Sequence, residues 1–187
     1  MPDEKRPRAD AQRNLDALVE AAKSVFTESG VTAPVRDIAA RAGVGVGTLY
    51  RHFPQRSDLV VAVMHHDVDA LTTAGRALAG GHDPIEALTQ WLLLYSRFVG
   101  TKHGLGSALR SGDPAYAGLP EYFEGNAVPE LGVLLDEAAA AGEIRDDMTA
   151  LELVRAVSDV TRTDDSAHTR RMIGLLVDGL RFGARRG

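Results

Sequence analysis

The chain has 187 residues, of which 44% are hydrophobic and 25% charged, as in an ordinary globular protein. It contains no cysteine, which excludes disulfides, thiol catalysis and thiolate metal sites. The formal net charge of −5 argues against a surface that attracts polyanions everywhere. Residues 1–60, however, hold nine Lys and Arg against eight Asp and Glu, so if the protein binds a polyanion, it does so through this first third.

No segment has the pattern of a membrane span or a secretory signal. Apolar runs such as WLLLY at residues 91–95 are far shorter than the roughly 18 residues that a span needs. The N-terminus has no apolar stretch, so we expect a cytoplasmic protein that begins with a flexible arm over residues 1–10. Arg6 and Arg8 of this arm are expected to be solvated, with a contact to a polyanion as the alternative.

Helical spacing of apolar residues dominates the chain. It predicts a long helix over 9–29, ended by Gly30, and a helix of about two turns that begins near Pro34 and ends at Gly43. A third, short helix follows and is closed by Pro54, since proline disfavours helix at the preceding residue.

The remaining two thirds of the chain continue in the same way. Pro129 is expected to kink or split one of these helices, and no segment alternates at period two. The sequence therefore predicts an all-α fold of about nine helices. The later ones span 55–79, 83–102, short pieces within 103–120, then 121–142, 149–162 and 167–182.

The second and third helices have the spacing of a helix-turn-helix. A small residue, Ala39, stands where the helices would cross, and Gly43 suits a turn that needs positive φ. Outward positions of the third helix carry hydrogen-bond donors suited to phosphates or base edges, which a plain helical hairpin does not explain. The residues expected to seal the inner faces are Ile38, Val44, Leu49 and Phe53.

The run IAARAGVGVGTLYRHFPQRSDL, residues 38–59, closely resembles the DNA-binding signature of the TetR family of bacterial transcriptional regulators. The resemblance implies a helix-turn-helix DNA-binding domain over 11–56 and a C-terminal effector-binding and dimerisation domain over 57–187. It also implies a repressor that binds a palindromic operator as a homodimer, through its last two helices, and that a small-molecule effector releases.

Carried over position by position, the resemblance assigns DNA contacts to the third helix and its surroundings. Gly45 and Gly47 are expected to let the start of this helix approach the DNA backbone closely. The chain departs from the pattern of many members at Pro34, Gly45 and Val46, where a hydroxyl or another polar side chain is common. The residues expected to bind DNA are Arg36, Gly45, Val46, Gly47, Thr48, Tyr50, Arg51, His52 and Arg56.

A stripe of aromatic residues at i, i+4 and i+7 in the predicted helix 83–102 has two interpretations. It is either plain core or one wall of an effector pocket, and a tyrosine in the stripe favours the pocket because a buried phenol needs a hydrogen-bond partner. The candidate ligand-binding residues are Met64, Trp91, Tyr95, Phe98 and His103.

Other chemistry has weak support. His65 and Asp69 are four apart on a helix and His66 is adjacent, but no third ligand has a metal-site spacing, so no metal site is predicted. No catalytic motif or cofactor signature is present, so the protein is not expected to be an enzyme. An all-α enzyme or carrier, or a pure interaction protein, are the alternatives that specific DNA binding would exclude.

Overall fold

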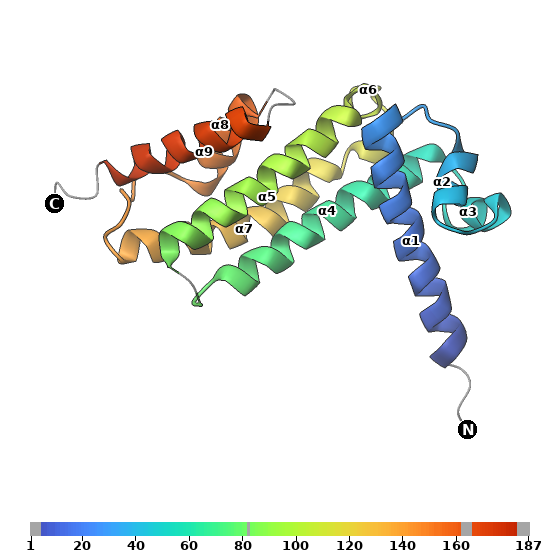
Figure 1. The fold of residues 1–187 in the computed structure, drawn as a ribbon, viewed down its shortest axis with the longest axis horizontal. Helices are drawn as coiled ribbons and strands as arrows, with labels where there is room; N and C mark the ends of the chain where they lie inside the picture. The colour runs from blue at the N-terminus through green and yellow to red at the C-terminus, as the bar shows by residue number, and fades with distance from the viewer. Residues whose placement is uncertain (1–4, 82, 162–165, 183–187) are drawn as a thin grey trace. The chain divides into compact units, whose positions relative to one another are not determined.

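The computed structural model describes residues 5–81, 83–161 and 166–182, with the side chains of 5–12, 103 and 104 left out. All regular structure in this part of the chain is helical, which confirms the predicted all-α fold (Figure 1). No described helix is long and apolar enough to cross a membrane. The elements are α1 (Lys5–Ser29), α2 (Val35–Arg41), α3 (Val46–His52), α4 (Arg56–Leu78), α5 (Pro84–Gly104), α6 (Gly106–Leu109), the 3₁₀ helix η1 (Pro114–Tyr116), α7 (Leu119–Ala140), α8 (Ala150–Val160) and α9 (Ser166–Arg181).

Helix α1 begins at Lys5, inside the segment expected to be a flexible arm. Of the two outcomes expected at Pro129, a split does not occur, because α7 continues through the proline, and a kink stays a prediction. The proline and Gly125, whose carbonyl loses its helical donor, are both exposed, so water can satisfy that carbonyl. Ala127 and Leu131 on either side are fully buried and anchor the helix across the interruption.

The chain forms two compact units, each built from two separate segments of the chain. The N-terminal unit comprises residues 1–66 and 101–119, and the C-terminal unit comprises residues 67–100 and 120–187. Helices α4 and α5 therefore each contribute to both units. The chain passes from one unit to the other three times.

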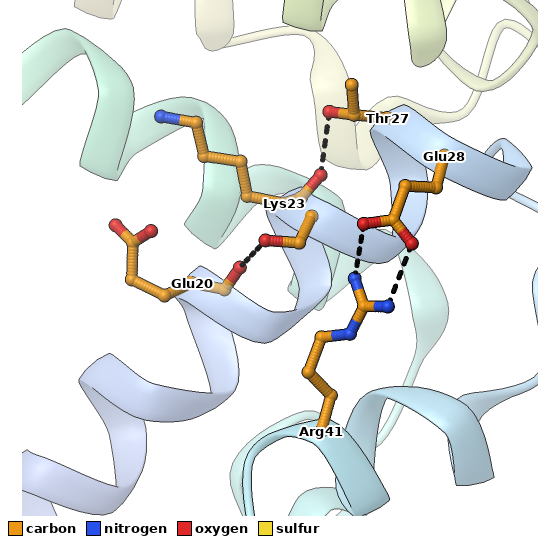
Figure 2. Close-up of polar contacts among 6 residues, drawn as sticks. Glu20, Lys23, Thr27, Glu28 and Arg41 are labelled. Carbon is orange, nitrogen blue, oxygen red and sulfur yellow. Dashed lines mark hydrogen bonds and ion pairs between the residues drawn. The ribbon is translucent and has the colours of Figure 1, made fainter.

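In the N-terminal unit, ion pairs connect α1 to its neighbours. Both guanidinium nitrogens of Arg41 in α2 donate to the carboxylate of Glu28 in α1, at 2.7 and 2.8 Å, as Figure 2 shows. The Arg41 guanidinium lowers the pKa of the Glu28 carboxyl. The imidazole Nε2 of His66 in α4 lies 2.7 Å from a carboxylate oxygen of Glu20 in α1. These two contacts join α1 to α2 and to α4.

The segment after α5 also belongs to the N-terminal unit. Residues of α6 and η1 border a surface hollow of about 510 Å³ together with the α1–α2 connection and the start of α4. Asp113 caps η1 by accepting from the backbone N–H of Ala115 at 2.9 Å. Burial and the Asp113 charge raise the pKa of Tyr116, which borders the same hollow. Part of the chain that follows α5 thus helps to build this unit.

The C-terminal unit is built around a close approach of α4, α5 and α7. The indole Nε1 of Trp91 in α5 donates to the carbonyl of Leu71 in α4 at 3.1 Å, and the Trp91 side chain is fully buried. A Cβ added at Gly75 would lie 2.6 Å from the Cβ of Glu130 in α7 and 3.2 Å from the indole nitrogen. Only glycine allows this approach. Arg76 and Glu130 are joined alongside it by a 2.8 Å ion pair.

The last two helices pack on their own unit. Thr149 and Glu152 form a capping box at the start of α8. Each helix has an apolar stripe, formed in α8 by Leu151, Val154, Val157 and Val160 and in α9 by Ile173, Leu176, Val177 and Leu180. Both stripes are mostly buried within the single chain. The buried members are Val154, Val157, Ile173, Val177 and Leu180, whereas Leu151, Val160 and Leu176 are half-buried and Leu175 is exposed.

Candidate nucleic-acid interface

The turn between α2 and α3 ends α2 with a glycine at positive φ, as the sequence predicts. Gly43 has φ +70°. Its N–H donates to the carbonyl of Ala40 at 3.1 Å, and the N–H of Val44 donates to that of Ala39 at 3.0 Å. These two bonds are a Schellman motif, which needs a residue comfortable in the left-handed region. Gly43 is therefore required by the turn itself.

The inner faces of α2 and α3 are sealed by small and apolar residues. Ile38 and Ala39 in α2 are buried, as are Leu49 in α3 and Phe53 directly after it. Val44 in the turn is only half-buried, so it contributes less to this seal than expected. Burial of these side chains fixes which face of α3 points outward.

The opposite face of α3 is exposed. The Val46 and Tyr50 side chains are 38% and 51% exposed, although large apolar and aromatic residues are usually covered. Arg51 and His52 are exposed as well, while Thr48 is half-buried. The predicted contact residues of this helix therefore share one accessible surface with several hydrogen-bond donors.

Neither α2 nor α3 begins with a side-chain cap. The cap positions are Pro34 and Gly45, and neither residue makes a side-chain hydrogen bond to its helix. The carbonyl of Gly45 accepts the first backbone bonds of α3, from the N–H groups of Thr48 at 2.9 Å and Leu49 at 3.2 Å, as at any helix start. The departures from the family pattern seen in the sequence thus correspond to missing hydroxyl caps.

The two arginines outside α3 differ in their surroundings. Arg36, near the start of α2, has a side chain 79% exposed and lies 3.6 Å from the carboxylate of its neighbour Asp37. Arg56, at the start of α4, reaches back to the α1–α2 connection, where its Nη1 donates to the carbonyls of Val31 and Ala33, the latter at 2.8 Å. Arg56 thus holds that connection in place, which the sequence did not indicate.

The predicted effector residues fall into two groups. Trp91, Tyr95 and Phe98 lie together in the C-terminal unit, each at most 7% exposed. Met64 is buried in the N-terminal unit, and His103 lies outside the described side chains. Whether these residues border one cavity stays a prediction.

The three aromatic residues of α5 are part of a larger ring cluster. The Tyr95 ring stacks on Trp91 and on Phe123 of α7, with centroids 5.7 and 5.6 Å apart, and Phe98 stacks on Phe123 at 5.5 Å. The Ser158 hydroxyl in α8 donates to the Val154 carbonyl and lies 2.7 Å from the Tyr95 hydroxyl, so the tyrosine is the donor to Ser158. Burial raises the pKa of Tyr95.

Phe123 and Ser158 were not identified from the sequence. Both come from helices far along the chain from Tyr95, and neither belongs to a recognisable motif. The only available signal was the expectation that a buried phenol needs a partner, which predicts a hydrogen bond without naming its acceptor.

The histidines of α4 take part in ordinary contacts. His66 pairs with Glu20, and the Asp69 carboxylate accepts a 2.6 Å hydrogen bond from the Tyr122 hydroxyl. Within the described residues, no group of three or more His, Cys, Asp or Glu side chains is arranged to hold a metal ion.

A short α2, a glycine turn, a short α3 with one buried and one exposed face, and a long α1 supporting both define a helix-turn-helix DNA-binding protein. Comparison with known proteins identifies the family. Residues 18–63 match the family described as bacterial regulatory proteins, tetR family. Residues 83–182 match the C-terminal domain described as transcriptional regulator SbtR-like. The chain belongs to the TetR family.

Solved structures of other family members agree over most of the chain. The TetR transcriptional regulator SCO0520 from Streptomyces coelicolor is 35% identical, with a TM-score of 0.77 over 89% of this chain and 98% of that one. A TetR regulatory protein from Mycobacterium vanbaalenii is 34% identical, with a TM-score of 0.73 over 93% of this chain and 98% of that one. The protein is thus a helix-turn-helix transcriptional regulator of this family, a class of regulators rather than enzymes.

Curated relatives match over a shorter segment. HTH-type transcriptional regulators from Staphylococcus aureus are 42% identical over 67 residues, which is 35% of this chain. The matched segment spans 36% of the length of those relatives.

Proposed function

We propose that this protein is a repressor that binds a palindromic operator as a homodimer and is released when a small-molecule effector binds its C-terminal domain. The observation that supports this most directly is the outer face of α3. There Tyr50, Arg51 and His52 are exposed beside Val46, while Leu49 is buried on the opposite face. A face of this kind is suited to the major groove of DNA.

Charge around α3 supports the choice of DNA as partner. Arg36 and Arg51 are exposed, and Arg51 and His52 lie in the last turn of α3. The rest of the chain is acidic overall, since the net charge is −5. A polyanion is therefore attracted to this surface and repelled by much of the remainder. The proposal places the phosphate contacts at Arg36, Thr48, Tyr50 and His52, with Arg56 as a further candidate.

Dimerisation is proposed through α8 and α9. Leu175 is 62% exposed on α9, and the adjacent Leu176 and Met172 are half-buried, so an apolar strip remains after the single chain has folded. A two-fold pair of such strips would bury them and would match the symmetry of a palindrome. Leu175 and Leu176 are therefore better candidates for the interface than the residues buried within the chain.

The effector is proposed to bind near the ring cluster formed by Trp91, Tyr95, Phe98 and Phe123, with Met64 and His103 as further candidates. Large aromatic surfaces and a single hydroxyl pair, Tyr95 and Ser158, suit a ligand that is mostly apolar with one polar group. Such a ligand must bind one state of the dimer better than the other, because equal binding to both shifts nothing. A cytoplasmic location is part of the proposal, since the operator lies there.

The proposal is tested by selecting duplexes from a random pool at fixed salt and measuring affinity for the best duplex as salt is varied. We expect a palindromic consensus, a steep loss of affinity with salt, and a mass of two chains per duplex. Arg36→Ala should weaken binding to every sequence, because Arg36 is one of the proposed phosphate contacts. Arg76→Ala removes an arginine of the C-terminal unit whose side chain is 70% exposed, compared with 79% for Arg36, and serves as the control. A pool that yields no preferred duplex would overturn the proposal.

A further inference from the structure

The start of α3 has two glycines that the fold itself does not require. A Cβ added at Gly45 or Gly47 would meet nothing within 4 Å among the described residues. Neither glycine has positive φ, unlike Gly43 two residues earlier. Glycine in a helix costs about 1 kcal/mol relative to alanine. Local stability therefore disfavours the glycine at 47, and a reason for it must lie outside the chain.

Between these glycines stands an exposed apolar side chain. Val46 is 38% exposed, whereas Leu49, on the inner face of the same helix, is 1% exposed. The exposed part of a valine consists of methyl groups, which neither donate nor accept hydrogen bonds. Since its neighbours at 45 and 47 have no side chains, Val46 provides the only side chain among residues 45–47.

We propose that Val46 reads the C5-methyl group of a thymine in each half of the operator, and that the flanking glycines allow the close approach this contact needs. The proposal rests on the proposed DNA-binding function and names the base chemistry that it recognises. In the major groove, thymine is the unmodified base that offers a methyl group, and apolar side chains distinguish it by contact with that group.

The surroundings of Val46 favour DNA over another partner. Tyr50, one turn further along α3, is 51% exposed, and Arg51, His52 and Arg36 add donors and positive charge nearby. A protein partner for an apolar residue would be matched by further apolar surface. Here the other exposed side chains of α3, Tyr50, Arg51 and His52, are groups that bind phosphates and base edges. DNA is therefore the partner that fits the exposed valine.

The experiment uses the full chain and the best duplex from the random selection. Each thymine in one half-site, and its symmetry mate, is replaced in turn by uracil, which deletes only the methyl group. Affinities are measured at one salt concentration for the wild type, for Val46→Ala and for Val133→Ala. Val133 in α7 is 44% exposed, so its variant makes the same change at a similarly exposed site in the other unit.

For the wild type, uracil at one position of each half-site should weaken binding by about fourfold per half-site, the effect expected for one buried methyl group. The same replacement should have no effect on Val46→Ala, and Val133→Ala should behave as the wild type. Affinity of Val46→Ala for the uracil duplex should match that of the wild type.

The inference is overturned if uracil has no effect at any position, or if it weakens Val46→Ala as much as the wild type. In either case the selected duplex still binds, so the proposed DNA-binding function survives. If no duplex binds specifically, both the inference and the proposed function fail. A selected operator without any thymine also contradicts the inference directly.

Discussion

Two helical glycines, Gly47 in α3 and Gly75 in α4, have opposite surroundings. Around Gly47 there is open space among the described residues, while a Cβ at Gly75 would lie 2.6 Å from the Cβ of Glu130. The glycine in the C-terminal unit is explained by packing within the chain. The glycine in the N-terminal unit has no such neighbour, and we propose that it allows DNA to approach closely. On this proposal the same residue type serves stability in one unit and recognition in the other.

The largest effect is expected at the crowded glycine. Gly75→Ala should destabilise the protein by about 1–3 kcal/mol, because α4 and α7 must separate and the bond from Trp91 to Leu71 must lengthen. Thermal and urea unfolding measure this change. Gly132→Ala in α7 is the control, since a Cβ there meets nothing within 4 Å in the described structure. Equal stability of both variants would show that the contact at Gly75 is not tight.

The next largest loss of stability is expected at Tyr95, in the ring cluster of the C-terminal unit. Tyr95→Phe should cost about 0.5–1.5 kcal/mol, since it removes one buried hydrogen bond while Ser158 keeps its bond to the Val154 carbonyl. Denaturant unfolding at neutral pH measures the loss, and an unchanged stability would mean that the hydroxyl pair contributes nothing.

Alkaline pH tests the same hydroxyl through its ionisation. Burial raises the pKa of Tyr95 above the ordinary value of 10.0, so the unfolded chain loses this proton first. The stability contribution is complete below pH 10 and falls as pH rises above it towards the pKa of the folded protein. Unfolding free energies measured across this range should fall less steeply for Tyr95→Phe than for the wild type. Parallel slopes would contradict the assignment.

The open glycine should respond in the opposite direction. Gly47→Ala is expected to stabilise the protein, by up to about 1 kcal/mol, because alanine favours the helix and meets no neighbour. It should also weaken DNA binding, since the added methyl group stands between α3 and the duplex. Gly132→Ala again serves as the control and should leave affinity unchanged. A variant that is more stable and binds equally well would contradict close approach at this position.

The smallest effect is expected at the ion pair shown in Figure 2. Glu28→Gln should change stability little at neutral pH, because both partners are exposed. Arg41 lowers the pKa of Glu28 below its ordinary 4.5, so the contribution is present above pH 4.5 and is lost as pH falls through the folded value. Acid titration of unfolding should therefore be slightly shallower for the variant, and an unchanged curve would show that the pair is energetically neutral.

Local signals in the sequence were sufficient for the helices and for the turn. Gly43 and Pro54 delimit α3 because one needs positive φ and the other disfavours helix before it, and both effects act within a few residues. The sequence left open whether Pro129 kinks α7 or splits it, and local preference alone could not decide that the helix continues. Its continuity depends on the burial of Ala127 and Leu131 by other helices, which overrides the local preference.

Contacts between distant segments could not be predicted from the sequence either. Arg56 donates to the backbone carbonyls of Val31 and Ala33, and backbone acceptors leave no signature in the amino-acid sequence. Ser158 and Phe123 reach Tyr95 only because α7 and α8 pack beside α5. Both α8 and α9 have an apolar stripe, but periodicity alone does not say whether an apolar face meets its own chain or a second copy.

The inclusion of residues 101–119 in the N-terminal unit limits how this protein can be recombined with its relatives. A chimera that exchanges residues 1–66 alone would pair a new DNA-binding head with the old α6 and η1, which border the α1–α2 connection around Tyr116 and Asp113. Exchange of operator specificity between family members therefore requires that both segments be transplanted together. In the design of hybrid regulators, the part to be exchanged consists of residues 1–66 and 101–119, which are separate in the gene although they form one compact unit.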